Sequence, residues 1–262
     1  MSDERTEEKP GESLPTGANH YRAFVGPGQK YDLMAAMQFN LLTLLGLREN
    51  HTLLDIGCGS LRGGRLFIPY LLPGNYYGME PEEWLVDEGI KNEVGRDLID
   101  LKKPTFSHDA DFTLTTFGQK FDFLLAQSIF SHASGKQMAR CLSEAVKVMT
   151  PTSVFAATYV RGNTNYTGDE WAYPECVTYT PHYMQSLAGE QELACVPLSW
   201  PHPNNQSWVV FTHRSNAKKI PSLGDPIDMG KRLRKLEKYI YVKARTKISA
   251  VLRKRKARGK SR

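Results

Sequence analysis

One acid and two closely spaced glycines stand where a nucleotide-like ligand could bind. They lie in Leu53-Leu54-Asp55-Ile56-Gly57-Cys58-Gly59-Ser60, where two apolar residues precede Asp55 and a helical pattern resumes at Leu61. A strand, a glycine turn and a helix in this order aim free backbone N–H groups and a helix N-terminus at one point. Glycine permits a positive φ and a close backbone approach that a Cβ would block. The alternative interpretation is a plain strand–turn–helix unit without a ligand.

The dinucleotide-binding fingerprint G-x-G-x-x-G is broken in this chain. Arg62 occupies the third glycine position, and Gly63 and Gly64 follow one residue too late. This disfavours a nicotinamide-dependent dehydrogenase. Glu80 ends the next expected strand, 25 residues after Asp55. That is near the spacing of an acid that accepts hydrogen bonds from ribose hydroxyls, although an acid there can also simply begin a helix.

The run Leu-Leu-Asp-Ile-Gly-Cys-Gly resembles the first motif of class I S-adenosylmethionine (SAM) methyltransferases. In that family the strand ends in an acid two residues before the first loop glycine, as Asp55 does. The usual third glycine of the loop falls at Leu61, which departs from the pattern. The resemblance covers roughly residues 21–213, and it implies SAM as the cofactor.

Further cofactor contacts follow from this resemblance. Asp109-Ala110 resembles the family's Asp-Ala pair after the third strand, which binds adenine, although Asp109 can instead cap local structure. Gln127 follows the fourth strand and offers an amide to the methionine end, and Arg62 either pairs with the carboxylate or is structural. The implied cofactor-binding set is Asp55, Gly57, Cys58, Gly59, Glu80, Asp109, Ala110 and Gln127.

The motif after the fourth strand bears on the methyl acceptor. Residues 126–128 read Ala-Gln-Ser, whereas methyltransferases of base or glutamine amide nitrogens typically carry Asn/Asp-Pro-Pro-Tyr/Phe there, and no Pro-Cys dipeptide suits cytosine C5 chemistry. Residues 61–65, 77–81, 130–132 and 202–206 look similar to bacterial methyltransferases of glycan and secondary metabolism. We therefore expect O-methylation of a small molecule such as a sugar or glycolipid. Methylation of RNA or protein and a non-catalytic SAM-fold binding module remain the alternatives.

A hydroxyl acceptor needs a general base. His132, His182 and His202 are candidates, although each taken alone is more often structural than catalytic, and His202 and His132 rank first because their segments are expected at the pocket mouth. Residues 161–180 form a long aromatic loop after a strand, where open α/β sheets bind ligands. No group of His, Asp and Glu has metal-ligand spacing. The expected acceptor pocket consists of Trp171, Tyr173, His182 and His202.

Alternating strand and helix patterns predict a doubly wound, mostly parallel sheet of seven strands. The resemblance implies that the last two strands form a hairpin and that the final strand is antiparallel. The expected strands are residues 52–56, 75–80, 105–107, 121–126, 153–160, 192–199 and 207–213, and the expected helices are residues 31–45, 61–72, 82–94, 136–149 and 181–188.

Charge divides the chain unevenly. Residues 231–262 hold 15 Lys or Arg and a single acid, Glu237, whereas the whole chain carries only +6, so the rest is acidic. Apolar residues recur at helical steps in this tail, which favours a basic amphipathic helix on an anionic membrane surface. A solvated tail or nucleic-acid binding are alternatives, the latter being disfavoured. The expected divisions are a disordered segment 1–18, a catalytic domain 19–215, a linker 216–228 and the tail 229–262.

The remaining composition places the protein in a broad class. Four scattered cysteines without a C-x-x-C pair suggest neither a disulfide framework nor a zinc site. No run of about 18 apolar residues predicts a membrane span, and the N-terminus lacks the apolar region of a signal peptide. We expect a cytosolic protein that can associate peripherally with a membrane.

Overall fold

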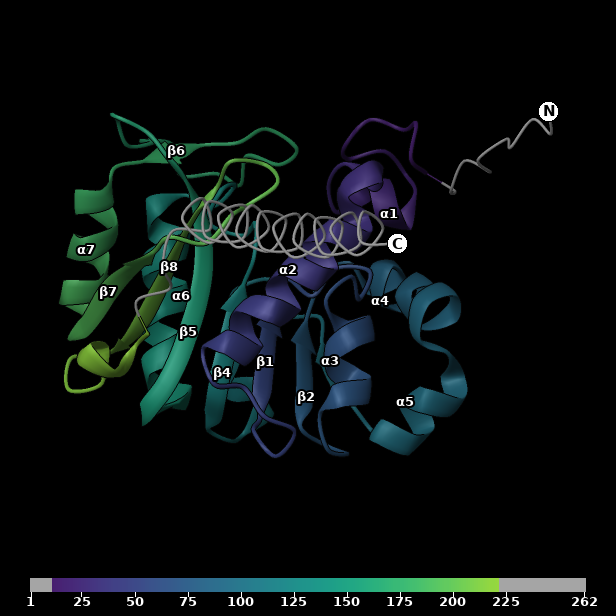
Figure 1. Ribbon diagram of the computed structural model, residues 1–262. Coiled ribbons are helices and arrows are strands. Elements are labelled where there is room, and N and C mark those ends of the chain that lie inside the picture. The colour runs from purple at the N-terminus through teal and green to yellow at the C-terminus, as the bar shows by residue number, and fades with distance from the viewer. Residues whose placement is uncertain (1–10, 222–262) are drawn as a thin grey trace, which may run out of the picture. The chain divides into compact units, whose positions relative to one another are not determined.

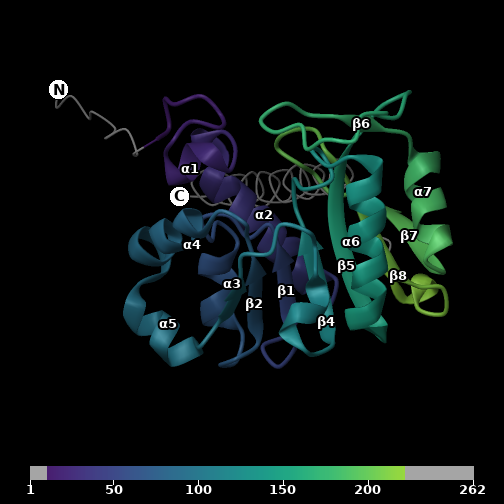
Figure 2. The same ribbon diagram turned by 180° about the vertical axis from the view of Figure 1, so that it is seen from behind.

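A computed structural model describes residues 11–221 and contains one eight-stranded sheet with helices on both faces (Figures 1 and 2). The expected tail and most of the expected linker lie outside the described residues. Within residues 11–18 the chain forms turns, and the side chain of Gln29 donates to the backbone carbonyl of Glu12. No helix among residues 11–221 is long and apolar enough to cross a membrane.

The sheet has the expected doubly wound topology. Its order is β3-β2-β1-β4-β5-β8-β7, in which β1 to β5 run parallel and β8 is antiparallel to both of its neighbours. The short strand β6 pairs with the end of β5 outside this path. The strands are β1 (Leu53–Ile56), β2 (Tyr76–Met79), β3 (Thr105–Ser107), β4 (Phe121–Ala126), β5 (Met149–Arg161), β6 (Thr178–Tyr179), β7 (Leu193–Leu198) and β8 (Ser207–His213).

Helices cover both faces because the central strands are apolar on both sides. Every residue of β1 is buried, as parallel strands between helix layers require. α2 (Tyr31–Leu44) and α3 (Gly64–Tyr70) cover the face turned to the viewer in Figure 1, and α6 (Gly135–Val148) covers the opposite face in Figure 2. The other helices are α1 (Tyr21–Phe24), α4 (Glu83–Gly89), α5 (Arg96–Lys102) and α7 (Pro181–Glu190).

Local sequence fixes where several helices begin. α6 starts with a capping box, because the Ser134 hydroxyl accepts from the N–H of Gln137 while the Gln137 side chain accepts from the N–H of Ser134. At the start of α7 the Thr180 hydroxyl accepts from the N–H of Tyr183, and Pro181 follows at the first helical position, where its missing N–H costs nothing.

Several elements differ from the sequence-based prediction. α3 begins at Gly64 rather than at residue 61, because Leu61 has a φ of 57° and cannot belong to a right-handed helix. The helix expected over residues 82–94 consists of α4 followed by a π-helical turn, η2 (Ile90–Val94). α5 was not expected, since its residues bury no apolar face.

The sheet order reverses between β1 and β4. In open α/β sheets such a switch point opens a crevice at the carboxyl ends of the strands, where ligands bind. Figures 1 and 2 place α1 and the loop that contains β6 at the same edge of the sheet, from opposite sides. The topology therefore brings the chain before β1 and the long loop after β5 toward one crevice.

Candidate active site

A cavity of about 490 Å³ lies at the carboxyl ends of β1, β2 and β4. Its wall includes all eight of the residues expected to bind the cofactor, and it is closed on other sides by residues of the N-terminal segment and of the loop after β5. The lining residues include Phe24, Val25, Gln38, Asp55, Gly57, Cys58, Gly59, Arg62, Glu80, Asp109, Ala110, Gln127, His132, Trp171 and Tyr173.

The glycine turn forms the floor of this cavity. Gly57 and Gly59 have φ values of 70° and 54°, in the left-handed region that glycine adopts without strain. A Cβ on Gly57 would collide with the side chain of Ile129, and one on Gly59 would lie 2.7 Å from Val25 Cγ1. Leu61, at the position where the resembled family has a third glycine, also adopts a positive φ, so the loop keeps its left-handed turn without that glycine.

Glu80 joins this turn to the end of β2. Its carboxylate accepts from the backbone N–H of Gly59 at 2.9 Å and from that of Glu82 at 3.1 Å. Burial raises the pKa of Glu80 to about 7, although both N–H donors oppose the shift. The carboxylate lines the cavity, where its remaining lone pairs can accept from hydroxyl groups.

Asp55 and Asp109 add two further carboxylates to the wall. Asp55 accepts from the Tyr76 hydroxyl at 2.8 Å, and burial raises its pKa to about 6. Asp109 is different, because one of its oxygens already accepts from the N–H groups of Asp111 and Thr113. Partial burial would raise the pKa of Asp109, but these N–H donors outweigh burial and hold the pKa below its usual value. Asp109 thus caps a turn and still lines the cavity beside Ala110.

Gln127 lies at the centre of a buried polar network at the end of β4. Its side-chain oxygen accepts from the guanidinium of Arg62 at 2.5 Å and from the amide of Gln38 at 3.2 Å. Its side-chain nitrogen donates to the Ser128 hydroxyl at 2.5 Å. These contacts connect α2, the glycine turn and β4, so the amide of Gln127 is held in one orientation.

His132 reaches the cavity from the turn after β4. Its Nδ1 lies 2.6 Å from the backbone carbonyl oxygen of Glu175, and its ring makes an edge contact with Tyr173 and a tilted contact with Trp171. A carbonyl only accepts, so the proton of the neutral ring is on Nδ1 and Nε2 keeps its lone pair. Burial lowers the pKa of His132, although the hydrogen bond to Glu175 opposes this, so the ring is neutral at pH 7.

The other two candidate histidines do not line the cavity. His202 is buried, the N–H groups of Asn204 and Gln206 donate to its Nδ1, and its Nε2 lies 3.0 Å from the amide nitrogen of Gln127. Burial, together with the charges of Arg62 and Lys30, lowers the pKa of His202 to about 3. His182 is exposed on α7. Of the residues predicted for the acceptor pocket, the cavity wall brings together Trp171 and Tyr173 but not these two histidines.

Residues 20–26, here called the roof segment, close the cavity from the N-terminal side. Phe24 and Val25 line it, the Tyr173 hydroxyl donates to the carbonyl of Phe24, and Arg62 donates to that of Val25 at 2.7 Å. No sequence motif assigned this segment to the site. The signal that could have found it is the dense aromatic and basic run His20-Tyr21-Arg22-Ala23-Phe24.

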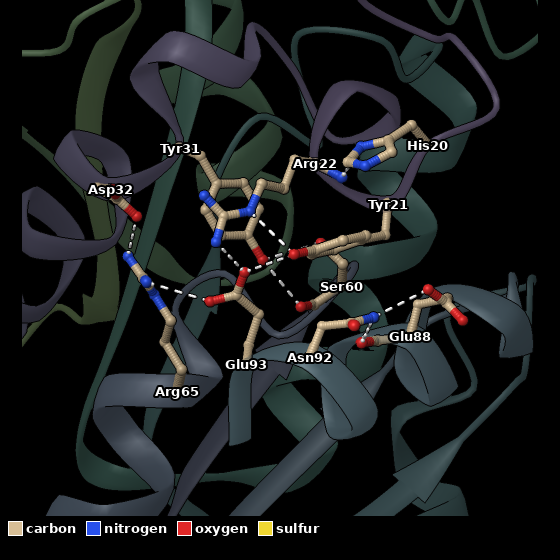
Figure 3. Close-up of polar contacts among 10 residues, drawn as sticks. All are labelled: His20, Tyr21, Arg22, Tyr31, Asp32, Ser60, Arg65, Glu88, Asn92 and Glu93. Carbon is tan, nitrogen blue, oxygen red and sulfur yellow. Dashed lines mark hydrogen bonds and ion pairs between the residues drawn. The ribbon is translucent and has the colours of Figure 1, made fainter. Parts of the chain in front are cut away.

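Glu93 in the π-helical turn fastens the roof segment (Figure 3). Its carboxylate, only 4% exposed, lies 2.5 Å from Arg22, accepts from the Tyr21 hydroxyl at 3.0 Å and pairs with Arg65 at 3.2 Å. Both guanidinium groups lie over the ring of Tyr31, whose hydroxyl donates to the carbonyl of Ser60 in the glycine turn. One buried acid therefore links the roof to α3 and, through Tyr31, to the floor of the cavity.

Metal-ligating side chains do not cluster in the described part of the chain. No group of three or more His, Cys, Asp or Glu side chains between residues 11 and 221 is arranged to hold an ion.

Comparison with solved structures identifies the fold. The methyltransferase CcbJ from Streptomyces caelestis has a TM-score of 0.56 at 13% identity, over 78% of this chain and 97% of that protein. The magnesium protoporphyrin IX methyltransferase ChlM from Synechocystis PCC 6803, with bound SAM, has a TM-score of 0.50 at 13% identity, over 71% and 78% of the two chains. The glycopeptide N-methyltransferase MtfA, complexed with SAM, has a TM-score of 0.51 at 9% identity, over 69% and 94%.

The strand order and these likenesses define the class: the chain has the class I methyltransferase fold. No protein-family model matches its sequence, and neither does any curated protein at a significant level.

Proposed function

We propose that this protein is a SAM-dependent methyltransferase that methylates a hydroxyl group of a small molecule. The single observation that carries the proposal is the state of His132. Its neutral imidazole lines the cavity, and the carbonyl of Glu175 holds the proton on Nδ1, so that Nε2 is free to accept one. A protein that only binds SAM would not need a neutral histidine with an unprotonated nitrogen in its cavity.

The residues around the cavity fit SAM. Glu80 and Asp109, near the ends of β2 and β3, supply carboxylate acceptors for the ribose hydroxyls and the adenine amine. The backbone of Gly57 and Gly59 and the amide of Gln127 lie toward β1 and β4, where the methionine end would bind. When bound, SAM supplies a methyl group made electrophilic by the sulfonium.

The protein's part in the reaction is to align the groups and to move one proton. As the acceptor oxygen bonds to the methyl group and the bond from methyl to sulfur breaks, Nε2 of His132 takes the hydroxyl proton. The products are the methyl ether and S-adenosylhomocysteine, and His132 then loses its proton to solvent. Residues of the roof segment and of the aromatic loop 161–180 line the cavity, where they would exclude water from this step and keep the reacting groups in contact.

The aromatic part of the cavity, where the compound to be methylated would bind, favours an uncharged compound with a flat face. Phe24, Trp171 and Tyr173 line it, and Phe24 packs edge-on against Trp84. Rings of this kind stack on sugar faces and on other rings alike. The cavity's acidic side chains would disfavour an acidic acceptor, and we therefore propose a sugar or a glycolipid headgroup.

Transfer of a labelled methyl group tests this function. The full chain is incubated with methyl-labelled SAM and a metabolite and lipid extract, and labelled products are identified by mass spectrometry. The proposal expects label on an oxygen of a glycan or other hydroxyl compound, in amounts that depend on His132. Label only on nitrogen, on RNA or on protein would overturn the proposed acceptor class, and no label on any fraction would favour a binding module.

A further inference from the structure

Arg62 is the one positively charged side chain in the wall of the described cavity. Only 9% of it is exposed, and no salt bridge joins it to any carboxylate of residues 11–221, whereas the neighbouring Arg22 and Arg65 both pair with Glu93. Its hydrogen bonds go to two neutral oxygens, those of Val25 and Gln127. A buried guanidinium without an anion is costly, because two neutral acceptors replace its hydration only in part.

The position of Arg62 suits the amino-acid end of SAM. The carboxylates of Glu80 and Asp109 follow β2 and β3, while Arg62 and Gln127 contact each other at the β4 side of the cavity. A ligand with its ribose and adenine at the acids therefore has its other end near Arg62. The reverse orientation would bring a carboxylate against Glu80, where like charges repel.

We propose that Arg62 is the receptor for the α-carboxylate of SAM, an inference that rests on the proposed function. A guanidinium presents donors in a planar fork that matches a carboxylate. The same side chain holds the carbonyl of Val25, so one cation contacts both the roof segment and the cofactor's acid group. The competing explanation is a purely structural role, in which Arg62 only joins Val25 to Gln127.

Two ligands separate these explanations. S-adenosylhomocysteine carries the amino-acid group, and 5′-methylthioadenosine has the same nucleoside and thioether without it. Titration calorimetry with both ligands is performed on the wild-type protein, on Arg62→Gln and on Arg62→Lys. We expect Arg62→Gln to weaken binding of S-adenosylhomocysteine about 30-fold, and that of 5′-methylthioadenosine by less than about threefold, because only the former loses a charge-assisted hydrogen bond. Arg62→Lys should retain part of the difference in affinity between the two ligands, since lysine keeps the positive charge but lacks the planar donors of the guanidinium.

Arg22→Gln is the matched control, because Arg22 is also a buried arginine of this region but already has a carboxylate partner. It should change the affinity for both ligands by the same factor. An equal loss for both ligands in Arg62→Gln, or no loss, overturns the inference and leaves the proposed function intact. If Arg62→Gln binds neither ligand, Arg62→Lys provides the test instead. The inference is overturned if Arg62→Lys prefers S-adenosylhomocysteine over 5′-methylthioadenosine by the same factor as the wild type. A wild-type protein that binds neither ligand refutes the proposed function itself.

Discussion

Nδ1 of His132 lies 2.6 Å from the carbonyl oxygen of Glu175, and this contact leaves Nε2 as the nitrogen without a proton in a ring that lines the cavity. The contact joins the turn after β4 to the aromatic loop after β5. Folding of that loop therefore sets both the wall of the acceptor site and the state of its base.

Replacing His132 should abolish most turnover without affecting the cofactor. Asparagine in its place keeps a donor for the Glu175 carbonyl but has no basic nitrogen, so we expect kcat to fall by about 10²- to 10⁴-fold. Affinity for S-adenosylhomocysteine should stay within about threefold, because no acceptor of the cofactor is removed. The control is His51→Asn, since His51 precedes β1 at the opposite edge of the sheet. Equal kcat for His132→Asn and the wild type would exclude His132 as the base.

At saturating SAM, the plot of kcat against pH should show a single fall in rate, on its acid side. Burial lowers the pKa of His132 below 6.5, and only the neutral ring accepts a proton, so the rate rises with pH through a pKa below 6.5 and is then level. Steady-state rates across the range from acid to neutral pH measure this. A limb above pH 7, or one that persists in His132→Asn, contradicts the assignment.

Binding of SAM should strengthen as pH rises through about 7, the raised pKa of Glu80. Below that pH the carboxyl group is protonated and loses an acceptor for the ribose hydroxyls, whereas above it the ionised form also attracts the positively charged cofactor. Calorimetry in two buffers of different ionisation enthalpy should detect proton release on binding near pH 7. Glu80→Gln should bind about 1–3 kcal/mol more weakly and lose the pH dependence near 7. An unaltered pH profile in this variant would assign the effect to another group.

Acid should destabilise the protein partly through His202. Burial lowers its folded-state pKa to about 3 from the ordinary 6.5, so between these values the unfolded chain binds a proton that the folded one does not. The free energy of unfolding is therefore lowered as pH falls through this window. Urea denaturation of the wild type and of His202→Gln at several pH values isolates the effect, since the raised pKa values of Asp55 and Glu80 act in the opposite direction in both. The variant should lose less stability on acidification, and parallel curves would refute the idea.

Glu93 should control how tightly the roof segment is held. Glu93→Gln leaves Arg22 and Arg65 facing each other across a neutral group, so hydrogen exchange of residues 20–26 should accelerate and SAM should dissociate faster. Glu88→Gln is the matched control, because Glu88 is 38% exposed and pairs with the exposed Lys91, a contact worth little. Exchange rates that match between the two variants would mean that Glu93 does not fasten the roof.

Local sequence patterns predicted the strands well but not every helix boundary. The glycine turn after Asp55 was predictable because only glycine adopts a positive φ readily, whereas the left-handed Leu61 breaks that rule, and the predicted helix began three residues early. The π-helical turn was also unpredictable, since its apolar spacing resembles that of an α-helix. It nevertheless matters, because it carries Glu93.

Which residues line the cavity was predictable where strand ends fix their positions. Glu80 and Gln127 follow directly from strands, so sheet topology alone brings them together. The roles of histidines on loops could not be predicted, because no sequence pattern distinguishes His132 from His202. His132 lines the cavity, whereas Nδ1 of His202 accepts from the N–H groups of its own loop. The roof segment was missed because its contacts with Arg62, Tyr173 and Glu93 are all distant in sequence.

The central claim is that the cavity at the ends of β1, β2 and β4 binds SAM, and calorimetric titration of the full chain tests it most directly. We expect S-adenosylhomocysteine and SAM to bind one to one with micromolar or tighter dissociation constants, NAD to give no binding heat, and Glu80→Ala to weaken binding by about 1–3 kcal/mol. Binding of NAD with no heat from either SAM or S-adenosylhomocysteine would contradict the account.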